Sequence, residues 1–304
     1  MSTPKIPRIP IETLTTQEFF EQHRSANKPA IISNLLPQQP SWNLDYLCQY
    51  LGDYPTPVRA YGRERYQQDK RQWQEIGRGM EPTTLSFAEF AQLIQRQEAR
   101  DRDIYLAKFP LTNTPLAHHP VLEEMINQLG LSWPATGFNL WIGPGGHTTC
   151  LHYDSVDSLL IQLQGSKKVV LFPPQELKNL YPFPVSVHLK HGLKLRASYS
   201  QVYPDRPDFS AFPKLKQALQ QRYDLTLQAG EVLYLPAGWW HEVTTLGDGV
   251  VSSINRFWHP HPLTRAAWSW NKWRVHLGSA LALPKILWEG MSNPQTWQSL
   301  MRRI

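Results

Sequence analysis

Cysteine is scarce in this chain, which holds only Cys48 and Cys150 among its 304 residues. A disulfide framework or a zinc site built from thiolates needs more sulfur, so the sequence argues against both. The low cysteine content favours a reducing, cytoplasmic setting. No apolar run approaches the roughly 20 residues that span a bilayer, and residues 1–10 contain prolines but no apolar segment. The sequence therefore predicts neither a membrane span nor a signal peptide.

Charge is also limited, because charged residues make up 18% of the chain and the net charge is +6. Much of the excess lies between His261 and Ile304, where six lysine and arginine residues accompany one acidic residue, Glu289. A solvated helix face explains this distribution more simply than a nucleic-acid site does. The same region carries aromatic residues of the kind that pack or form interfaces. They are Trp268, Trp270, Trp273, Trp288 and Trp297.

Hydrophobic residues, in contrast, reach the ordinary proportion of 41%, which excludes wholesale disorder. A chain of this length can bury a substantial core, either as one domain with helical additions or as two domains. The 26 prolines and 12 tryptophans favour a loop-rich β protein with large aromatic packing units, because proline interrupts both helices and central strands.

The region from Phe138 to Phe257 predicts β structure, because glycine and proline separate short apolar or alternating runs. Their spacing favours a sandwich or barrel over alternating βαβ units. An insert from about 174 to 222 is expected after the fourth strand, with short helices at Gln175–Leu180 and Pro213–Gln221. The eight expected strands are Phe138–Ile142, Thr149–Tyr153, Ser158–Gln164, Lys167–Phe172, Tyr223–Leu227, Glu231–Leu235, Trp239–Thr245 and Val250–Phe257.

The region before these strands reads as mixed structure. A helix is expected to begin with Thr16 as its N-cap, and another begins with a serine at Ser86. Pro29–Ser33 predicts a short buried strand, and the apolar residues of Ser41–Leu51 have helical spacing. The polar stretch from Arg63 to Arg78 has no clear period and is predicted to be a surface excursion.

His152 and Asp154 form the informative pattern, in the segment Thr-Cys-Leu-His-Tyr-Asp. Residues two apart on a strand project to the same face, so these two side chains point together. A histidine and a carboxylate on one interior face supply two of the three ligands of a facial triad, with positions left open for oxygen and a cosubstrate. His241, which follows the turn Pro236-Ala-Gly at the mouth of a distant strand, is the candidate third ligand.

A plainer interpretation exists, since a His-x-Asp triplet is common by chance. The position of the three residues supports the metal hypothesis, because the pair lies on the second of eight expected strands and His241 on the seventh. Other histidines show that a distant histidine alone proves little. They include His118, His119, His147, His188, His191 and His259.

Further motifs follow in the order found in a known family. They are Thr-x-x-His-Tyr-Asp from Thr149, Gly165–Pro174, Gly230–Pro236, Trp240-His241 and Asn255–Trp258. From about Asp103 to Trp258 the sequence resembles the Jumonji C oxygenases. Among them it is similar to the small cupin-like branch that includes the asparaginyl hydroxylase acting on hypoxia-inducible factor. The resemblance implies a double-stranded β-helix and the use of iron(II), 2-oxoglutarate and molecular oxygen.

The expected fold is therefore mainly β with flanking helices: a double-stranded β-helix of the jelly-roll, cupin-like type with helical N- and C-terminal additions. Three regions are expected. Residues 1–133 form a mixed α/β region that packs on the core, 134–260 form the catalytic core with the insert 174–222, and 261–304 form C-terminal helices. Members of this branch often dimerise through such helices, so the resemblance implies a homodimer.

The resemblance also assigns a pocket for the distal carboxylate of 2-oxoglutarate, which needs a buried cation and hydroxyl donors. Lys167 matches the family's carboxylate-binding lysine, Thr149 its hydroxyl partner, and Tyr105 the tyrosine that completes the pocket. Alternation sends one of Lys167 and Lys168 inward, and the family register favours Lys167. An exposed lysine and a core tyrosine are the plainer interpretations.

Two positions depart from the family. An asparagine often stands six residues after the first ligand, where this chain has Ser158. Many members also place an asparagine directly before the Phe-Trp of the last strand. Here Asn255 is displaced by one residue, which could turn it to the other face of the strand. Asn255 is retained as a cosubstrate-binding candidate, and neither departure changes a metal ligand.

The candidate substrate contacts are Ser198, Tyr199 and Trp239. In the asparaginyl hydroxylase an Arg-Gln pair just before a Ser-Gln-Val contacts the target amide, and Ser198 and Tyr199 occupy those positions here. A site built to hydrogen-bond one side chain rejects others, so the difference favours another target.

Three functions remain open. Hydroxylation of a side chain of a protein or peptide, coupled to conversion of 2-oxoglutarate to succinate and CO2, is favoured. An oxygenase acting on RNA or on a small molecule is the alternative, and the basic tail is its local support. A non-oxygenase cupin that binds a metal is the third, although an incomplete ligand set or a missing Lys167 would favour it more.

Overall fold

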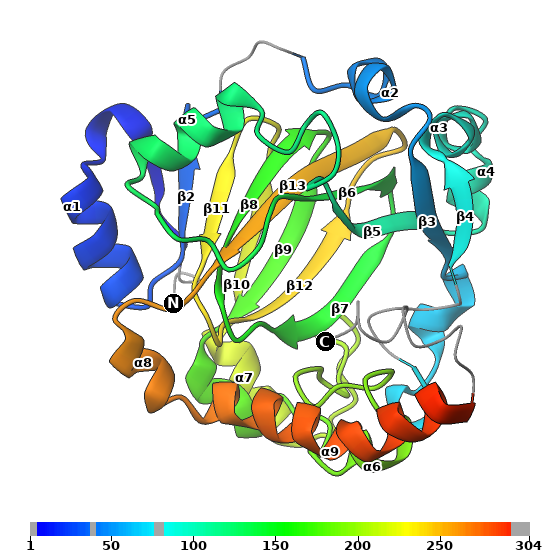
Figure 1. The fold of residues 1–304 in the computed structure, drawn as a ribbon. Coiled ribbons are helices and arrows are strands. Elements are labelled where there is room, and N and C mark those ends of the chain that lie inside the picture. Colours follow the sequence, from blue (N-terminus) through cyan, green and yellow to red (C-terminus); the bar gives the residue numbers. More distant parts are fainter. Residues whose placement is uncertain (1–4, 37–40, 76–81, 293–304) are drawn as a thin grey trace.

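Two β-sheets form the centre of the protein, as seen in a computed structural model that describes residues 5–36, 41–75 and 82–292 (Figure 1). The larger sheet has nine strands in the order β1-β2-β11-β8-β13-β6-β5-β3-β4. The smaller has four strands in the order β10-β9-β12-β7. Helices lie around the outside of this β centre (Figure 1). The prediction of a mainly β protein with flanking helices is confirmed.

The eight core strands lie where the sequence predicts them, and consecutive strands belong to different sheets except for β9 and β10, which both lie in the smaller sheet. Neighbouring core strands are antiparallel. This is the double-stranded β-helix expected from the resemblance. The strands are β6 Asn139–Pro144, β7 Thr148–Tyr153, β8 Asp157–Gln164, β9 Lys167–Phe172, β10 Tyr223–Leu227, β11 Val232–Leu235, β12 Trp240–Thr245 and β13 Val250–Trp258.

The N-terminal region extends the larger sheet on both sides. Two strands pair beside β11, and three continue the sheet beyond β6. Helices of the same region cover the outer face of this sheet, where Phe19 and Phe90 join Ile161 and Ile254 in the main hydrophobic core. The strands are β1 Arg8–Pro10, β2 Ala30–Ser33, β3 Pro55–Ala60, β4 Thr83–Ser86 and β5 Ile104–Pro110. The helices are α1 Thr16–Glu18, α2 Leu44–Leu51, α3 Phe87–Gln95, α4 Glu98–Asp101 and α5 Pro120–Gln128.

One predicted helix cap was wrong by one residue. The side chain of Thr15, not that of Thr16, accepts a hydrogen bond from the backbone N–H of Glu18. The Glu18 carboxylate in turn accepts from the Thr15 N–H at 2.9 Å, which completes a capping box. Two adjacent threonines made the two positions equivalent in the sequence pattern. The cap predicted at Ser86 is present at the start of α3.

The segment Arg63–Glu75 lies largely at the surface as predicted, but two of its side chains are buried. Lys70 is 0% exposed and Trp73 is 6% exposed. The Lys70 ammonium donates to the carbonyl of Val202 at 2.7 Å and lies 4.0 Å from the centroid of the Tyr203 ring. These distant partners replace water around the charge, and the short 3-10 turns of the segment carry no helical period that a sequence could reveal. Residues 76–78 of the predicted excursion lie outside the described residues.

The insert between β9 and β10 covers the outer face of the smaller sheet, where Leu151 and Trp240 pack against Leu180 and Leu215. It carries α6 Val187–His191 and α7 Leu215–Ala218, with a 3-10 turn where the first helix of the insert was predicted.

The C-terminal helices α8 Leu263–Ala267 and α9 Trp270–Ser292 follow β13, and α9 runs along the insert (Figure 1). Arg274 of α9 donates to the carbonyl of Phe183 at 2.7 Å. Trp297 lies outside the described residues. Among the helices of the described ranges, none has the length and apolarity that crossing a membrane requires.

The buried carboxylate of Asp157 connects the N-terminal region and helix α8 with the β core. Asp157 at the start of β8 is 1% exposed. It accepts hydrogen bonds from the Tyr234 hydroxyl at 3.1 Å and from the Ala237 N–H at 2.9 Å. It also pairs with Arg265 of α8 and lies 3.7 Å from Arg24 of the N-terminal region. We call this set of contacts the Asp157 junction.

Candidate metal centre and cosubstrate pocket

The register of the smaller sheet brings the candidate residues to its inner face. His241 of β12 pairs with His152 of β7 and with Leu171 of β9, and Thr245 of β12 pairs with Lys167. Directly paired residues of antiparallel strands share a face, and His241 and Thr245 share one because they are four apart. The metal candidates and Lys167 therefore line the same interior.

The three candidate ligands converge on one point. One ligand atom from each of His152, Asp154 and His241 lies within 4.8 Å of the others. The Nε2 atom of His241 is 3.8 Å from a carboxylate oxygen of Asp154, and the two imidazole rings have centroids 4.1 Å apart. Two imidazoles and one carboxylate are the donor set of a non-haem iron(II) site with open positions.

Backbone contacts orient both imidazoles. His152 Nδ1 lies 2.9 Å from the carbonyl of Cys150, and His241 Nδ1 lies 3.1 Å from the carbonyl of Trp239. A carbonyl only accepts, so each Nδ1 carries the proton and each Nε2 keeps its lone pair for a metal. Burial and the neighbouring His241 lower the pKa of His152 to about 3, which keeps this ring neutral at physiological pH. The residues present fit an iron(II) ion.

A β-bulge places Thr149 on the ligand face. Residues three apart on a regular strand point to opposite faces. In β7, however, His152 pairs with His241 whereas Thr149 pairs with Val243, so the register shifts by one residue between them. Since Val243 and His241 share a face, Thr149 and His152 share it as well. The three-residue spacing of the motif thus depends on this irregularity.

Lys167 and Lys168 lie on opposite faces of β9. Lys167 is 3% exposed, and its ammonium donates to the Ser253 hydroxyl of β13. Lys168 lies on the outer face and forms an ion pair with Asp205. Within the described part of the chain no carboxylate pairs with Lys167, and burial lowers its pKa to about 7. A buried cation with a hydroxyl beside it and no anion fits the distal carboxylate of 2-oxoglutarate.

The remaining cosubstrate candidates are also buried. Tyr105 of β5 is 2% exposed and stacks on His147. Asn255 is two residues from Ser253, so it faces the interior and not the opposite side, and its side chain accepts from the Trp141 indole at 3.0 Å. Ser158 is buried as well. It pairs with Leu235, which belongs to a hydrophobic cluster between the two sheets.

The three substrate candidates have different surroundings. Tyr199 lies against the metal candidates, with its ring stacked on His152 at 4.7 Å and an interplanar angle of 10°. The carbonyl of Ser198 accepts from the Tyr153 N–H, which ties this part of the insert to β7. Trp239 is buried among aliphatic side chains between the sheets and donates to the carbonyl of Asn27. Its contacts are those of a core residue, and a substrate role stays a prediction.

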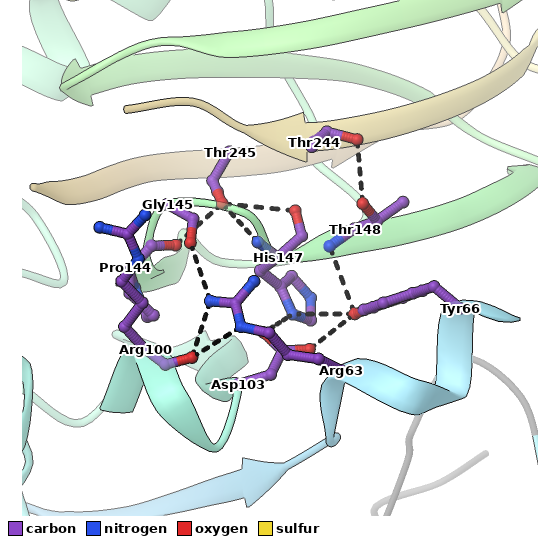
Figure 2. A network of polar contacts seen from close by, with 10 residues as sticks. All are labelled: Arg63, Tyr66, Arg100, Asp103, Pro144, Gly145, His147, Thr148, Thr244 and Thr245. Atoms are coloured by element: carbon purple, nitrogen blue, oxygen red, sulfur yellow. Dashed lines mark hydrogen bonds and ion pairs between the residues drawn. The ribbon is translucent and has the colours of Figure 1, made fainter. Parts of the chain in front are cut away.

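Sequence reasoning missed a polar network beside the pocket (Figure 2). It centres on His147, which was counted only among the chain's other histidines, and on the buried Asp103. Tyr66, from the segment predicted to be a surface excursion, hydrogen-bonds to Asp103. Only the turn at Gly143–Gly146 marks this place in the sequence, and it gives no sign of partners so distant along the chain.

Comparison with known proteins agrees with this geometry. A profile described as "Cupin-like domain" matches residues 16–264. The chain belongs to the cupin-like domain family. Its domain is of the Jumonji C type within the 2-oxoglutarate oxygenase superfamily, whose Jumonji C members use iron(II) and 2-oxoglutarate. The narrower likeness to the hydroxylase of hypoxia-inducible factor stays a prediction.

The relatives differ in their named activities. The chain is 30% identical to lysine-specific demethylase JMJ31 of Arabidopsis thaliana, over 53% of this chain and 29% of that protein. It is 29% identical to JmjC domain-containing protein D of Dictyostelium discoideum, over 76% and 52% respectively. It thus spans about half or less of these two relatives. It is also 26% identical to human tRNA wybutosine-synthesizing protein 5, over 84% of this chain and 78% of that protein.

Proposed function

We propose that this protein is an iron(II)- and 2-oxoglutarate-dependent oxygenase that hydroxylates a side chain of a protein or peptide. The observation that carries the proposal is the inner face of the smaller sheet. There the ligand set His152, Asp154 and His241 shares an interior with Lys167, a buried cation for which the described residues provide no counter-charge. A metal-binding cupin without oxygenase activity would have no use for that second feature.

The chain's own residues have distinct roles in this proposal. His152, Asp154 and His241 would hold an iron(II) ion through two imidazoles and one carboxylate. Lys167 and Thr149 bind the distal carboxylate of 2-oxoglutarate, and Tyr105 closes that end of the pocket. Tyr199, stacked on His152, shields this ligand on the side of the insert and excludes water there. The bound iron and cosubstrate supply the oxidising chemistry.

The overall reaction balances without a further reductant. 2-Oxoglutarate and O2 react with a C–H bond of the substrate to give succinate, CO2 and the C–OH product. One oxygen atom enters succinate and the other enters the substrate. Where the oxidised carbon is an N-methyl group, the product breaks down to the free amine and formaldehyde, so a demethylase and a hydroxylase share the same first product.

RNA is the second candidate substrate, and one observation favours it. The tRNA wybutosine-synthesizing protein is matched over most of both chains, whereas the demethylase relatives are covered over about half of their length or less. The basic tail from His261 to Ile304 is its support in the sequence, but Arg265 pairs with the buried Asp157 and Arg274 donates to the carbonyl of Phe183.

Anaerobic titration with iron(II) and 2-oxoglutarate, followed by oxygen and a succinate assay, tests the oxygenase class. We expect one iron per chain and slow succinate formation without a substrate. Failure to bind 2-oxoglutarate in the presence of iron contradicts the proposal. Incubation with peptide pools or bulk tRNA, followed by intact-mass analysis, then separates the two substrate classes by a gain of one oxygen atom or a loss of one methyl group.

We also infer that the protein forms a homodimer through α8 and α9, in a cytoplasmic setting consistent with two free cysteines. Large apolar side chains on these helices and in the turn between them are exposed, among them Leu263, Trp268, Trp270, Leu277 and Leu287. Monomeric proteins rarely expose so many together. Light scattering is expected to show a dimer that Leu277→Glu with Leu287→Glu converts to a monomer. A monomeric parent protein at tens of micromolar contradicts the inference.

A further inference from the structure

His147 is a buried histidine that the proposed chemistry does not use. It lies in the turn between β6 and β7 and is 3% exposed. Its ring stacks face to face on Tyr105, with centroids 3.8 Å apart and an interplanar angle of 6°. Tyr61 contacts the same ring edge-on at 4.8 Å. His147 therefore packs directly against Tyr105, the residue proposed to close the cosubstrate pocket.

Asp103 holds the imidazole in this orientation. The carboxylate is 0% exposed, and its two oxygens have different partners, His147 Nδ1 at 3.0 Å and the Tyr66 hydroxyl at 2.8 Å (Figure 2). Burial opposes ionisation of Asp103, but the hydrogen bonds from His147 and Tyr66 and the nearby Arg63 guanidinium together outweigh it and lower the pKa of Asp103. A charged acceptor gives a stronger bond than a neutral one, so the ring is held firmly.

The same network reaches the start of β7. The Tyr66 hydroxyl accepts from the Thr148 N–H at 3.3 Å, one residue before Thr149. The Thr245 hydroxyl accepts from the His147 N–H at 2.9 Å and donates to the Pro144 carbonyl at 2.8 Å (Figure 2). The network thus connects β5, which carries Tyr105, with β7, which carries Thr149. These strands supply two of the three groups assigned to the distal carboxylate.

We propose that His147, held by Asp103 and Tyr66, is a positioning residue that sets the cosubstrate pocket by fixing Tyr105 and the start of β7. The proposal rests on the proposed function. His147 acts through Tyr105 and Thr149 and does not touch the metal ligands. If His147 had only a structural role, replacing it would lower stability and weaken the binding of both ligands alike. Replacing a positioning residue should instead weaken the binding of 2-oxoglutarate selectively.

The test compares His147→Phe with two other variants. Phenylalanine keeps a flat ring against Tyr105 but loses the bond to Asp103. Tyr66→Phe removes one hydroxyl and disturbs the core less, so it serves if His147→Phe folds poorly. The matched control is His23→Phe. Like His147, His23 is a buried histidine, but it lies in the N-terminal region and its Nδ1 contacts the backbone carbonyl of Lys28. Iron(II) affinity, melting temperature and anaerobic 2-oxoglutarate affinity are measured for each protein.

We expect His147→Phe to weaken 2-oxoglutarate binding by about 10- to 100-fold, taking the range found for groups that orient a metal ligand as the guide for a group that orients a cosubstrate ligand. Tyr66→Phe should have a smaller effect in the same direction. Iron(II) affinity should stay within about twofold of the parent, and His23→Phe should change neither ligand. In a Tyr105→Phe background the loss caused by His147→Phe should shrink, because coupled residues are not additive.

Unchanged 2-oxoglutarate affinity in folded His147→Phe and Tyr66→Phe overturns the positioning role and leaves the proposed function intact. An equal loss of iron and 2-oxoglutarate affinity, or full additivity with Tyr105→Phe, overturns it too. A parent protein that binds iron(II) but no 2-oxoglutarate instead contradicts the proposed function, and this inference with it.

Discussion

Two aspartates three residues apart meet opposite surroundings. Asp157 is 1% exposed, and two arginines, a hydroxyl and a backbone N–H surround its carboxylate. The side chain of Asp154 is 34% exposed, and its carboxylate accepts no hydrogen bond within the described residues beyond an approach by His241 at 3.8 Å. The fold satisfies the first carboxylate internally and leaves the second open.

This difference distinguishes a charged group that stabilises the fold from one that is available to bind a ligand. A buried ion that makes all its bonds within the protein contributes to one arrangement of the chain and has no capacity for a ligand. An open carboxylate beside two oriented imidazoles contributes little to folding but retains its lone pairs for a metal. The two neighbouring lysines repeat this contrast among cations: Lys168 pairs with Asp205, whereas Lys167 has no anionic partner in the described part of the chain.

Removing the open carboxylate should have the largest effect on turnover and almost none on stability. We expect Asp154→Ala to bring succinate formation below detection, because three protein ligands leave none spare, while the melting temperature stays near that of the parent. His152→Ala should also lose turnover. Iron content and a succinate assay measure both variants. Full turnover with iron still bound one to one in His152→Ala would sink the ligand assignment.

Removing the satisfied carboxylate should do the reverse. Asp157→Asn leaves Arg24 and Arg265 without their counter-charge, and breaking a buried pair in this way lowers the free energy of unfolding by about 3–5 kcal/mol. Urea unfolding measures the change, and iron should still bind to the folded fraction. Asp205→Asn is the control, since exposed ion pairs contribute only about 0–1 kcal/mol. Equal midpoints for Asp157→Asn and the parent contradict the comparison.

The two lysines extend the comparison to the cosubstrate. Lys167→Ala should weaken 2-oxoglutarate by roughly a hundredfold or more, because the dicarboxylate then loses a buried charge partner worth about 3–5 kcal/mol. Iron affinity should change far less, and Lys168→Ala should leave both ligands unaffected. Anaerobic calorimetry on the two variants gives the answer. The reverse pattern would show that β9 is shifted by one residue.

A smaller effect is expected from pH. Burial lowers the pKa of Lys167 to about 7 in the free protein, whereas the dianionic cosubstrate needs the protonated ammonium. Below pH 7 the proton is already present. Above pH 7 binding must take up a proton, so affinity should fall by up to about tenfold for each pH unit. Lys167→Arg stays charged and should lose this slope. A flat profile for the parent between pH 7 and 9 contradicts the assigned role.

Local signals in the sequence were enough to predict the eight core strands and the convergence of the ligands. Glycine and proline punctuate each strand, and the two-residue spacing of His152 and Asp154 is itself a strand property. The face of Thr149 was not readable, because it depends on a bulge set by pairing with β12. The burial of Lys70 was equally hidden, since its partners lie more than a hundred residues away.

The Asp157 junction also bears on the order in which the chain matures. Asp157 finds Arg265 only 108 residues later, and Arg265 donates to a carbonyl 241 residues before it. During synthesis the eight core strands emerge first, with that carboxylate still lacking one of its partners. Contacts of such long range slow folding. A chain that stalls before α8 would therefore hold all eight core strands but would bury the Asp157 carboxylate without the Arg265 guanidinium.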